Sequence, residues 1–369
     1  MKHVICTVTN DLGHDQRMQR ICASLAAAGY RVTLVGRLRP GSPELPDFPF
    51  AVHRIRCRFD SGKLFYLEYN ARLLDYLLRT PHDAVNAIDL DTLLPAWLAA
   101  RQRNVPCIYD AHELFPETPE VARRPLVRRA WSALARRIIP RLPLAYTVGP
   151  ALADWFSREY GIPFGVVRNM PIAATVPPAE PVTGGLRLIH YQGMLNEGRG
   201  LESLLRAMPL LPPEYRLRLV GDGDIKEDLE MLAQELGIGF RTDFLGYRPP
   251  AELPALAAAA WLGVNLLESR SMSYYFSLAN KAFDYVQAGL PSLQMNFPEY
   301  RALAEEYPVY VFSEKLEPAA IARTILELGA DNDRYQLICA ACREAARVWT
   351  WEREEEELIR LWKRAVPLR

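Results

Sequence analysis

Short apolar segments alternate with segments of helical spacing along the N-terminal part of the chain. The apolar segments are rich in β-branched residues, which predicts buried strands within residues 3–8, 30–37, 83–89, 106–111 and 144–150. Between them apolar residues recur every three or four positions, as in 17–29, which ends at a glycine typical of a helix C-terminus. Strands that alternate with helices pair in parallel through right-handed crossovers. The pattern therefore predicts a doubly wound, Rossmann-like α/β domain over residues 1–172.

A second series of the same kind follows a stretch rich in Pro and Gly. This stretch, residues 173–185, has no apolar period and is predicted to be an interdomain linker. We expect a second Rossmann-like domain over residues 186–350 and a charged helix over 351–369. Ligands of doubly wound sheets bind beyond the carboxyl ends of the strands, so a site in a cleft between two facing domains is expected. Strands of the second series are expected within 186–193, 215–224, 241–246, 261–268 and 291–296.

Composition and charge exclude several classes of protein. Half of the 369 residues are hydrophobic, and 44 basic residues balance 44 acidic ones. This balance argues against a dedicated nucleic-acid binder and against a disordered chain. The six cysteines are too sparse for a disulfide-stapled scaffold, and Cys339 and Cys342 fall in a helical pattern whose buried face they are expected to occupy. This sparse use of cysteine indicates a reducing cytosol, so we expect a cytoplasmic protein. No apolar segment reaches the roughly 20 residues of a membrane span.

The first candidate site is a strand, loop and helix start within HYQGMLNEGRGLESLLRA. Gly193 follows the strand, and Arg199 lies where the next helix begins. Free amides and the helix dipole at such a place attract anions, so a cradle for a diphosphate is one interpretation, and an ordinary loop with a surface arginine is the other. Gly221 lies in LVGDGD, which lacks the third glycine of the dinucleotide fingerprint. This segment is either a tight turn or the wall of a nucleotide pocket.

The segment SYYFSLANKAFDYVQAG holds the densest candidate chemistry. Ser277 and Asn280 are expected to cap a helix. Lys281 stands near the start of this helix, where a structural role favours an acid, so an anionic ligand close by is expected. Asp284 lies one turn further, and a carboxylate accepts hydrogen bonds from vicinal hydroxyls such as those of a ribose. The alternative is a capped amphipathic helix without a ligand.

The first domain carries its own candidates at two strand ends. Gly13 directly follows the first strand, and polar residues succeed it within TNDLGHDQRMQR. His112 and Glu113 follow the strand of YDAHELFPE, where a histidine serves in catalysis or holds a sugar hydroxyl, although a lone histidine is also often structural. The polar residues after Gly13 are His14, Asp15 and Arg17, and we expect this cluster to face the cleft.

Two further patterns bear on metals and membranes. Three DxD matches occur, but a tripeptide this loose arises by chance, and no metal site is expected. No metalloprotease, hydrolase or NTPase motif is present. Residues 123–141 hold seven arginines and no acid, interleaved with apolar residues. Such a segment is either a solvated helix with its apolar face in the core or a contact to an anionic membrane.

In order and spacing, these motifs resemble those of the retaining glycosyltransferases of family 4, which have the GT-B fold. The resemblance spans nearly the whole chain, from TNDLGHDQRMQR through YDAHEL, VVRNMP, YQGMLNEGRG, LVGDGD and FLGYRPPAELPAL to NKAFDYVQAGLP. It implies two facing Rossmann-like domains with a nucleotide-sugar donor on the second. It also implies that the last helix crosses back onto the first domain.

The resemblance also implies roles for single residues. Arg199 matches the second basic residue of the family's phosphate-binding pair, and Met194 occupies the position of the first. The family usually has a pair of glutamates in this segment. Asp284 matches the second of them and should hold the ribose. Phe276 replaces the first, which normally touches the transferred sugar. Tyr247 matches the place where main chain meets the base. Because a basic residue is missing at Met194, its charge is expected to come from Lys281.

The resemblance implies transfer of a sugar from a nucleotide diphosphate, UDP rather than GDP, to an acceptor hydroxyl with retention. The setting it implies is the synthesis of cell-envelope polysaccharide or another glycoconjugate. The acceptor is a glycan or is lipid-linked, and it is expected near Gly13, Asp15 and the loop at 59–70. His112 or Glu113 would orient the sugar, while cations and amides would stabilise the leaving diphosphate without a metal or other cofactor. Alternatives are a nucleotide-sugar epimerase and an inactive sugar-nucleotide-binding partner.

The resemblance also assigns these residues to three sets. The acceptor-binding set is His14, Asp15 and Arg17. The catalytic set is His112, Glu113, Arg199 and Lys281. The donor-binding set is Gly13, Gly193, Arg199, Gly221, Tyr247, Ser277, Asn280, Lys281 and Asp284.

Overall fold

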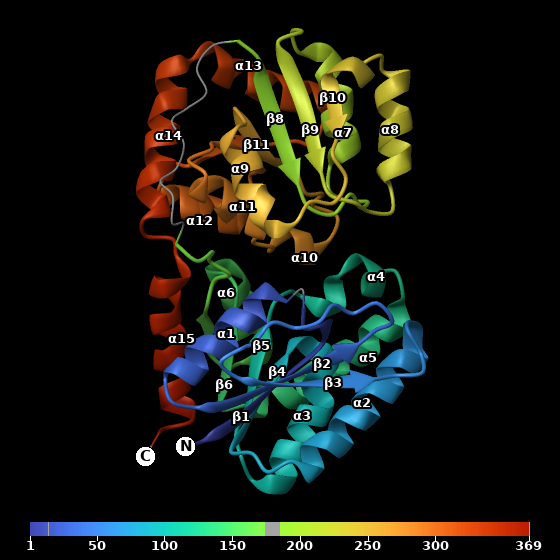
Figure 1. Ribbon diagram of the computed structural model, residues 1–369, viewed down its shortest axis with the longest axis vertical. Helices are drawn as coiled ribbons and strands as arrows, with labels where there is room; N and C mark the ends of the chain where they lie inside the picture. The colour runs from blue at the N-terminus through green and yellow to red at the C-terminus, as the bar shows by residue number, and fades with distance from the viewer. Residues whose placement is uncertain (14, 174–184, 369) are drawn as a thin grey trace. The chain divides into compact units, whose positions relative to one another are not determined.

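The computed structural model describes residues 1–13, 15–173 and 185–368, and their contacts divide the chain into two compact units (Figure 1). Unit 1 comprises Met1–Asn169 and Glu352–Arg369, and unit 2 comprises Met170–Trp351. Most of the predicted linker, residues 174–184, lies outside the described residues. Each unit is a parallel sheet flanked by helices, so the predicted α/β class is confirmed.

The seven-stranded parallel sheet of unit 1 has the order β3-β2-β1-β4-β5-β6-β7. The order reverses between β1 and β4, and the carboxyl ends of these strands therefore flank the switch point where such sheets bind ligands. The strands are β1 (His3–Asp11), β2 (Arg31–Leu38), β3 (Ala51–Arg56), β4 (Ala84–Ile88), β5 (Cys107–Ala111), β6 (Leu144–Thr147) and β7 (Phe164–Val166). The helices are α1 (Gln16–Ala27), α2 (Gly62–Arg79), α3 (Asp89–Arg103), α4 (Pro119–Ala122), α5 (Pro125–Ile138), α6 (Pro150–Tyr160) and α15 (Trp351–Ala365).

The six-stranded parallel sheet of unit 2 has the order β10-β9-β8-β11-β12-β13, with its switch point between β8 and β11. Its strands are β8 (Arg187–Gln192), β9 (Tyr215–Val220), β10 (Thr242–Phe244), β11 (Leu262–Asn265), β12 (Ser292–Met295) and β13 (Tyr310–Ser313). The helices are α7 (Leu201–Ala207), α8 (Lys226–Glu235), α9 (Leu253–Ala258), α10 (Met272–Tyr275), α11 (Asn280–Gln287), α12 (Pro298–Glu306), α13 (Pro318–Ala330) and α14 (Asn332–Ala346). In α14 Cys339 and Cys342 are fully buried, as the helical pattern predicts.

The last helix, α15, packs within unit 1 (Figure 1). Glu354 accepts hydrogen bonds from the backbone and the guanidinium of Arg168, and the hydroxyl of Tyr30 donates to Val366 at 2.8 Å. Trp362 is fully buried against Tyr30. Leu358 and Leu361 of this helix are also buried. Among the described residues, no helix is long and apolar enough to cross a membrane.

The prediction of a loop at 59–70 is wrong, because α2 begins at Gly62. Phe65, Tyr69, Leu73 and Leu77 recur every fourth residue and are all buried, so one helical face packs on the sheet. The sequence pattern also missed β3, β7 and β13. Of these, β3 lies at the sheet edge and is largely exposed, so it lacks an apolar run.

Candidate functional site

Two glycine loops meet at the carboxyl edge of the unit 2 sheet. Gly193, after β8, and Gly221, after β9, have φ angles of 131° and 139°, which side chains rarely allow. A Cβ atom on Gly221 would lie 1.9 Å from the carbonyl oxygen of Gly193. The Gly221 amide donates to the carbonyl of Gly246 at 2.9 Å, which joins the loop after β10 to the same wall. The loops after three neighbouring strands thus form a wall of bare backbone at the switch point.

Two cations adjoin this wall. Lys281, on α11, is 9% exposed, and a Cβ atom on Gly193 would lie 3.1 Å from its ammonium nitrogen Nζ. Arg199 lies directly before Gly200, the N-cap of α7. Lys281 Nζ lies 3.8 Å from the ring centroid of Tyr191, and the guanidinium carbon of Arg199 lies 5.2 Å from that of Tyr274. An aromatic face contacts a cation without supplying a counter-charge, so neither ring would compete with an anion for these groups.

The electrostatics of Lys281 indicate a site that lacks negative charge. Burial lowers the pKa of this ammonium well below its ordinary value, and the nearby charge of Arg199 lowers it further, while Asp284 acts in the opposite direction. Neither cation forms an ion pair with another described residue. A bound dianion would oppose the lowering of the Lys281 pKa, because its negative charge would offset both the loss of hydration and the repulsion from Arg199.

Asp284 is half-buried on α11 and accepts a hydrogen bond from the side-chain amide of Gln192 at 3.0 Å. Ser277 and Asn280 do not cap this helix as predicted: its N-cap is Ala279, and no side chain of the described part of the chain caps it. The Ser277 hydroxyl turns back to donate to the carbonyl of Tyr274, and Asn280 is the exposed first residue of α11. Both residues nevertheless lie at the helix start that bears Lys281.

Among the other positions that the resemblance concerns, Gly13 lies in unit 1, and Tyr247, Met194 and Phe276 lie in unit 2. Tyr247 follows β10 and is 67% exposed. Met194, in the loop after Gly193, is 55% exposed. Phe276 lies at the end of α10 and packs edge-on against Tyr275.

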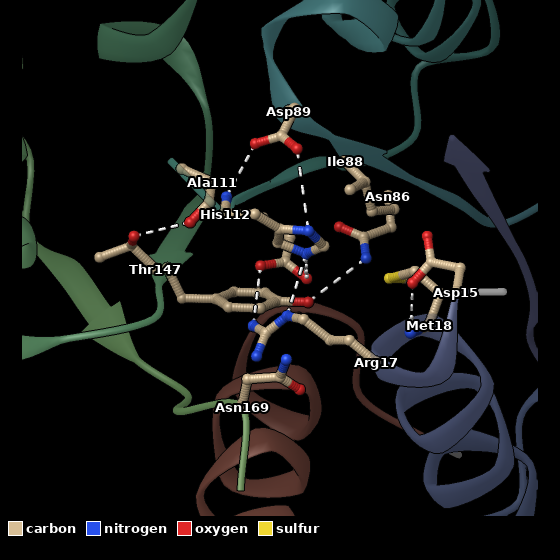
Figure 2. Close-up of polar contacts among 12 residues, drawn as sticks. Asp15, Arg17, Met18, Asn86, Ile88, Asp89, Ala111, His112, Thr147 and Asn169 are labelled. Carbon is tan, nitrogen blue, oxygen red and sulfur yellow. Dashed lines mark hydrogen bonds and ion pairs between the residues drawn. The ribbon is translucent and has the colours of Figure 1, made fainter. Parts of the chain in front are cut away.

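The carboxyl edge of unit 1 holds a buried cluster of charges around His112 (Figure 2). The His112 ring nitrogen Nε2 lies 3.2 Å from Asp110 Oδ2 and accepts a hydrogen bond from Arg17 Nε at 3.0 Å. Arg17 also pairs with Asp110 at 3.1 Å, and both side chains are almost completely buried. The other ring nitrogen, Nδ1, lies 3.7 Å from Asp89 Oδ2. The imidazole therefore stands between two carboxylates from neighbouring strand ends.

The charge states of this cluster depend on one another. Burial alone would lower the pKa of His112, but Asp110 and Asp89 outweigh it and hold this pKa above its ordinary value. Burial would likewise raise the pKa of Asp110, but Arg17 and His112 keep it low. Asp89 has a φ of 54° and accepts a hydrogen bond from the His112 amide at 2.8 Å. This hydrogen bond fixes the start of the loop that carries the histidine.

The predicted acceptor residues have largely structural contacts. Arg17 is turned inward, because the buried carboxylate of Asp110 needs its charge. Asp15 is the N-cap of α1 and accepts from the Met18 amide at 3.1 Å. A Cβ atom on Gly13 would clash with Pro43, and Glu113 is exposed beside His112. His14 lies outside the described residues.

Asp91 gives a test of the electrostatics in unit 1. Burial, with a contribution from Asp89, raises its pKa to about 7, and its carboxylate accepts from the Thr9 hydroxyl at 2.6 Å. The folded protein therefore binds this proton more tightly than the unfolded chain, so stability decreases as the pH rises from about 4 to about 7. We expect Asp91→Asn to add about 2–4 kcal/mol to the free energy of unfolding at pH 8 and little at pH 4.

Chemical denaturation of both proteins at the two pH values measures this difference. Asp154→Asn, at an exposed position on α6, serves as the control and should change stability little at either pH. An equal effect of Asp91→Asn at both pH values would contradict the assignment of a buried, protonated carboxyl.

None of the DxD pairs gathers further metal ligands. Asp91 bonds to Thr9, Asp331 is the N-cap of α14, and Asp222 lies within reach of Lys226 at 3.9 Å. Across the described residues, no group of three or more His, Cys, Asp or Glu side chains could hold a metal ion.

Sequence reasoning missed three polar residues of these two sites: Gln192, Asp110 and Asp89. Asp110 lies at the end of β5, two residues before His112, and Asp89 directly follows β4. Their position at strand ends could therefore have identified both as candidate site residues. The sequence gives no reason to select Gln192, because a glutamine at the end of a strand is not part of a known motif.

Two Rossmann-like units in series, each with its polar site at the carboxyl edge of a parallel sheet, define the GT-B class of architecture. Two family models match the chain: the glycosyl transferase 4-like domain over residues 13–173 and glycosyl transferases group 1 over residues 187–331. The chain belongs to the family 4-like glycosyltransferases.

Solved structures and curated relatives agree with this assignment. Sucrose-phosphate synthase from Thermosynechococcus elongatus has a TM-score of 0.82 at 17% identity, over 98% of both chains. HepE from Anabaena in complex with UDP-glucose has a TM-score of 0.75 at 16% identity, over 98% of this chain and 99% of that one. A D-inositol 3-phosphate glycosyltransferase from Corynebacterium urealyticum is 26% identical over 187 residues, 48% of this chain and 43% of that protein. The alignments span less than half the length of the curated relatives.

Proposed function

We propose that the protein transfers a sugar from a nucleotide diphosphate to an acceptor hydroxyl with retention of configuration. The observation that carries this proposal is the pair of cations, Lys281 and Arg199, beside the bare backbone of Gly193 at the switch point of unit 2. Cations and amides fixed in advance stabilise the negative charge that develops on a leaving diphosphate as its bond to the sugar breaks. In this proposal they do so without a metal ion.

Lys281 takes over the charge that the family places at the position of Met194. Its ammonium reaches the Gly193 loop from α11, a different element, and lies beside the residue that precedes Met194. Asp284 holds the ribose, and Tyr247, exposed at the end of the same wall, borders the base. The binding of UDP-glucose by HepE supports a uridine donor.

The first unit binds the acceptor in this proposal, and the second binds the donor. His112 is the group that orients the transferred sugar, because its imidazole is held between Asp89 and Asp110 at a strand end. Glu113, exposed beside it, is the second candidate. Arg17 holds His112 and Asp110 in place. In this proposal retention comes from reaction on the face that the diphosphate leaves, and no side chain acts as nucleophile.

A donor screen tests the reaction class. Thermal shift with UDP-, GDP-, ADP- and TDP-sugars identifies the ligand, and incubation with glycan or lipid-linked acceptors followed by mass spectrometry identifies the product. We expect stabilisation by a UDP-sugar and transfer that persists within about twofold in excess EDTA, because the bound charge is neutralised by protein. Loss of transfer in EDTA that Mg²⁺ restores would contradict a metal-independent reaction. An isomerised donor without acceptor would indicate an epimerase, and tight binding without product an inactive partner.

A basic surface on α5 supports a cytoplasmic protein that binds the inner face of the membrane. Leu126 is 77% exposed, and Arg129 and Arg137 are exposed on the same helix. The Trp131 ring faces the protein, 6.3 Å from that of Tyr66 on α2, so part of the apolar face packs inward. On α2 the exposed Leu64 and Leu67 add apolar area near this helix.

We expect the double variant Arg129→Glu, Arg137→Glu to bind phosphatidylglycerol vesicles at least tenfold more weakly than the wild type, since each basic residue near an anionic surface contributes about 1 kcal/mol. Vesicle co-sedimentation measures the binding. Arg158→Glu, on α6, serves as a control for net charge. Unchanged binding of the double variant to the vesicles would contradict a membrane contact through α5.

A further inference from the structure

We propose that Gln192 and His190 are positioning residues that hold the carboxylate of Asp284 in the orientation that a nucleotide ribose requires. The proposal rests on the ribose role of Asp284 given above. Three linked side chains carry it, and they lead from the buried centre of the unit 2 sheet to its carboxyl edge. His190 is fully buried and Gln192 is 3% exposed, whereas Asp284 is half-buried.

The chemistry of the three groups allows one arrangement of hydrogen bonds. Gln192 Nε2 lies 3.0 Å from Asp284 Oδ2, and Gln192 Oε1 lies 3.2 Å from His190 Nε2. A carboxylate only accepts, so the amide nitrogen of Gln192 faces Asp284 and its oxygen faces the histidine. His190 must then donate through Nε2.

Burial keeps this histidine neutral, because it lowers its pKa to about 4, and the charges of Arg218 and Lys281 act in the same direction. The neutral ring carries its proton on Nε2, and Nδ1 is buried without a partner among the described residues. The donor direction therefore runs from His190 through Gln192 to Asp284. Neither of the first two residues reaches the surface, so they act through the carboxylate.

The amide of Gln192 competes with a strong neighbour for Asp284. Lys281 stands three residues earlier on the same helix, and its ammonium attracts this carboxylate. If Asp284 turned to Lys281, it would leave the ribose and neutralise a cation that the diphosphate needs. The hydrogen bond from Gln192 holds Oδ2 on the side of β8 and keeps the two functions of α11 apart.

Binding of UDP and of 2′,3′-dideoxy-UDP, measured by titration calorimetry, tests the inference. The wild type is expected to prefer UDP by at least about tenfold, because hydroxyls that donate to a carboxylate form strong hydrogen bonds. In Gln192→Met, which keeps the volume and removes both hydrogen bonds, the preference should fall to within about threefold. The affinity for dideoxy-UDP should stay within about threefold of the wild-type value. Asp284→Ala should show the same loss of preference.

Gln294→Met provides a matched control. Gln294 is a fully buried glutamine on β12, two strands from β8 in the same sheet, and its amide bonds to Ser292 and Asn265 rather than to Asp284. A structural defect would lower the affinity for both nucleotides alike. Loss of positioning would lower only the affinity for UDP, which has the ribose hydroxyls. If Gln192→Met does not fold, Gln192→Leu, which also has no hydrogen-bond donor, should show the same loss of preference.

The outcomes separate this inference from the proposed function. A wild type that binds UDP and dideoxy-UDP equally, or binds neither, would overturn the ribose role of Asp284. A hydroxyl preference that disappears in Asp284→Ala but persists in both Gln192 variants would overturn the positioning role alone.

Discussion

Replacement of Lys281 by Met should reduce kcat/KM for sugar transfer by at least about a hundredfold while the protein stays folded. The ammonium is buried beside Gly193 and rests on the Tyr191 ring, where it stabilises the leaving diphosphate. Removal of one such group costs about 3–4 kcal/mol of transition-state stabilisation. Met has a similar length and no charge, and burial already penalises the ammonium, so the free energy of unfolding should not decrease.

Steady-state kinetics and a thermal melt on the same samples measure the two effects. The control is Lys226→Met, which removes a more exposed lysine of unit 2 that lies 3.9 Å from Asp222. It should leave kcat/KM within about twofold. A Lys281→Met variant with full activity would contradict the diphosphate site, whereas one that melts at a much lower temperature would show a structural role.

Replacement of Asp284 by Ala should lower kcat/KM by about thirtyfold to a hundredfold. The variant loses a charged acceptor for the ribose hydroxyls, and hydrogen bonds to charged groups contribute about 1.5–3 kcal/mol each. Asp284 also lies near Lys281, so removal of its charge leaves that ammonium more strongly disfavoured. We expect most of the loss to appear in KM for the donor, because the ribose does not take part in the bond change.

Kinetics with varied donor concentration separate KM from kcat. Asp228→Ala, at an acidic residue of α8 in the same unit, is the control for a lost carboxylate and should leave both constants near the wild type. A loss confined to kcat with unchanged KM would contradict a ribose contact.

Periodicity predicted most of the fold because most strands of both units are buried on both sides. Such strands appear as short apolar runs between helical patterns, as in β1 and β8. The sequence pattern did not predict the edge strand β3, because this strand is largely exposed. It did not predict α2, because polar residues surround the four that this helix buries. The family resemblance, rather than periodicity, identified the role of α15.

The sequence predicted the cations of the site but not the residues that position the site's side chains. Lys281 stood out because a helix start normally carries an acid, and the structure brings it to Gly193, which is remote in sequence. The inward turn of Arg17 was not predictable, since it depends on Asp110, a buried carboxylate on another strand. The same holds for Gln192, whose partner Asp284 lies 92 positions away. Pattern reasoning finds residues of unusual type for their position and misses ordinary residues whose partners are distant.

The most direct test is a crystal structure of the protein with UDP bound in the presence of EDTA. We expect the diphosphate against the backbone of Gly193, with its oxygens in contact with Lys281 Nζ and the Arg199 guanidinium, and the ribose hydroxyls on Asp284. A diphosphate bound away from Lys281 and Arg199, or UDP that enters the crystal only when Mg²⁺ is restored, would contradict the proposal that protein cations alone hold the leaving group.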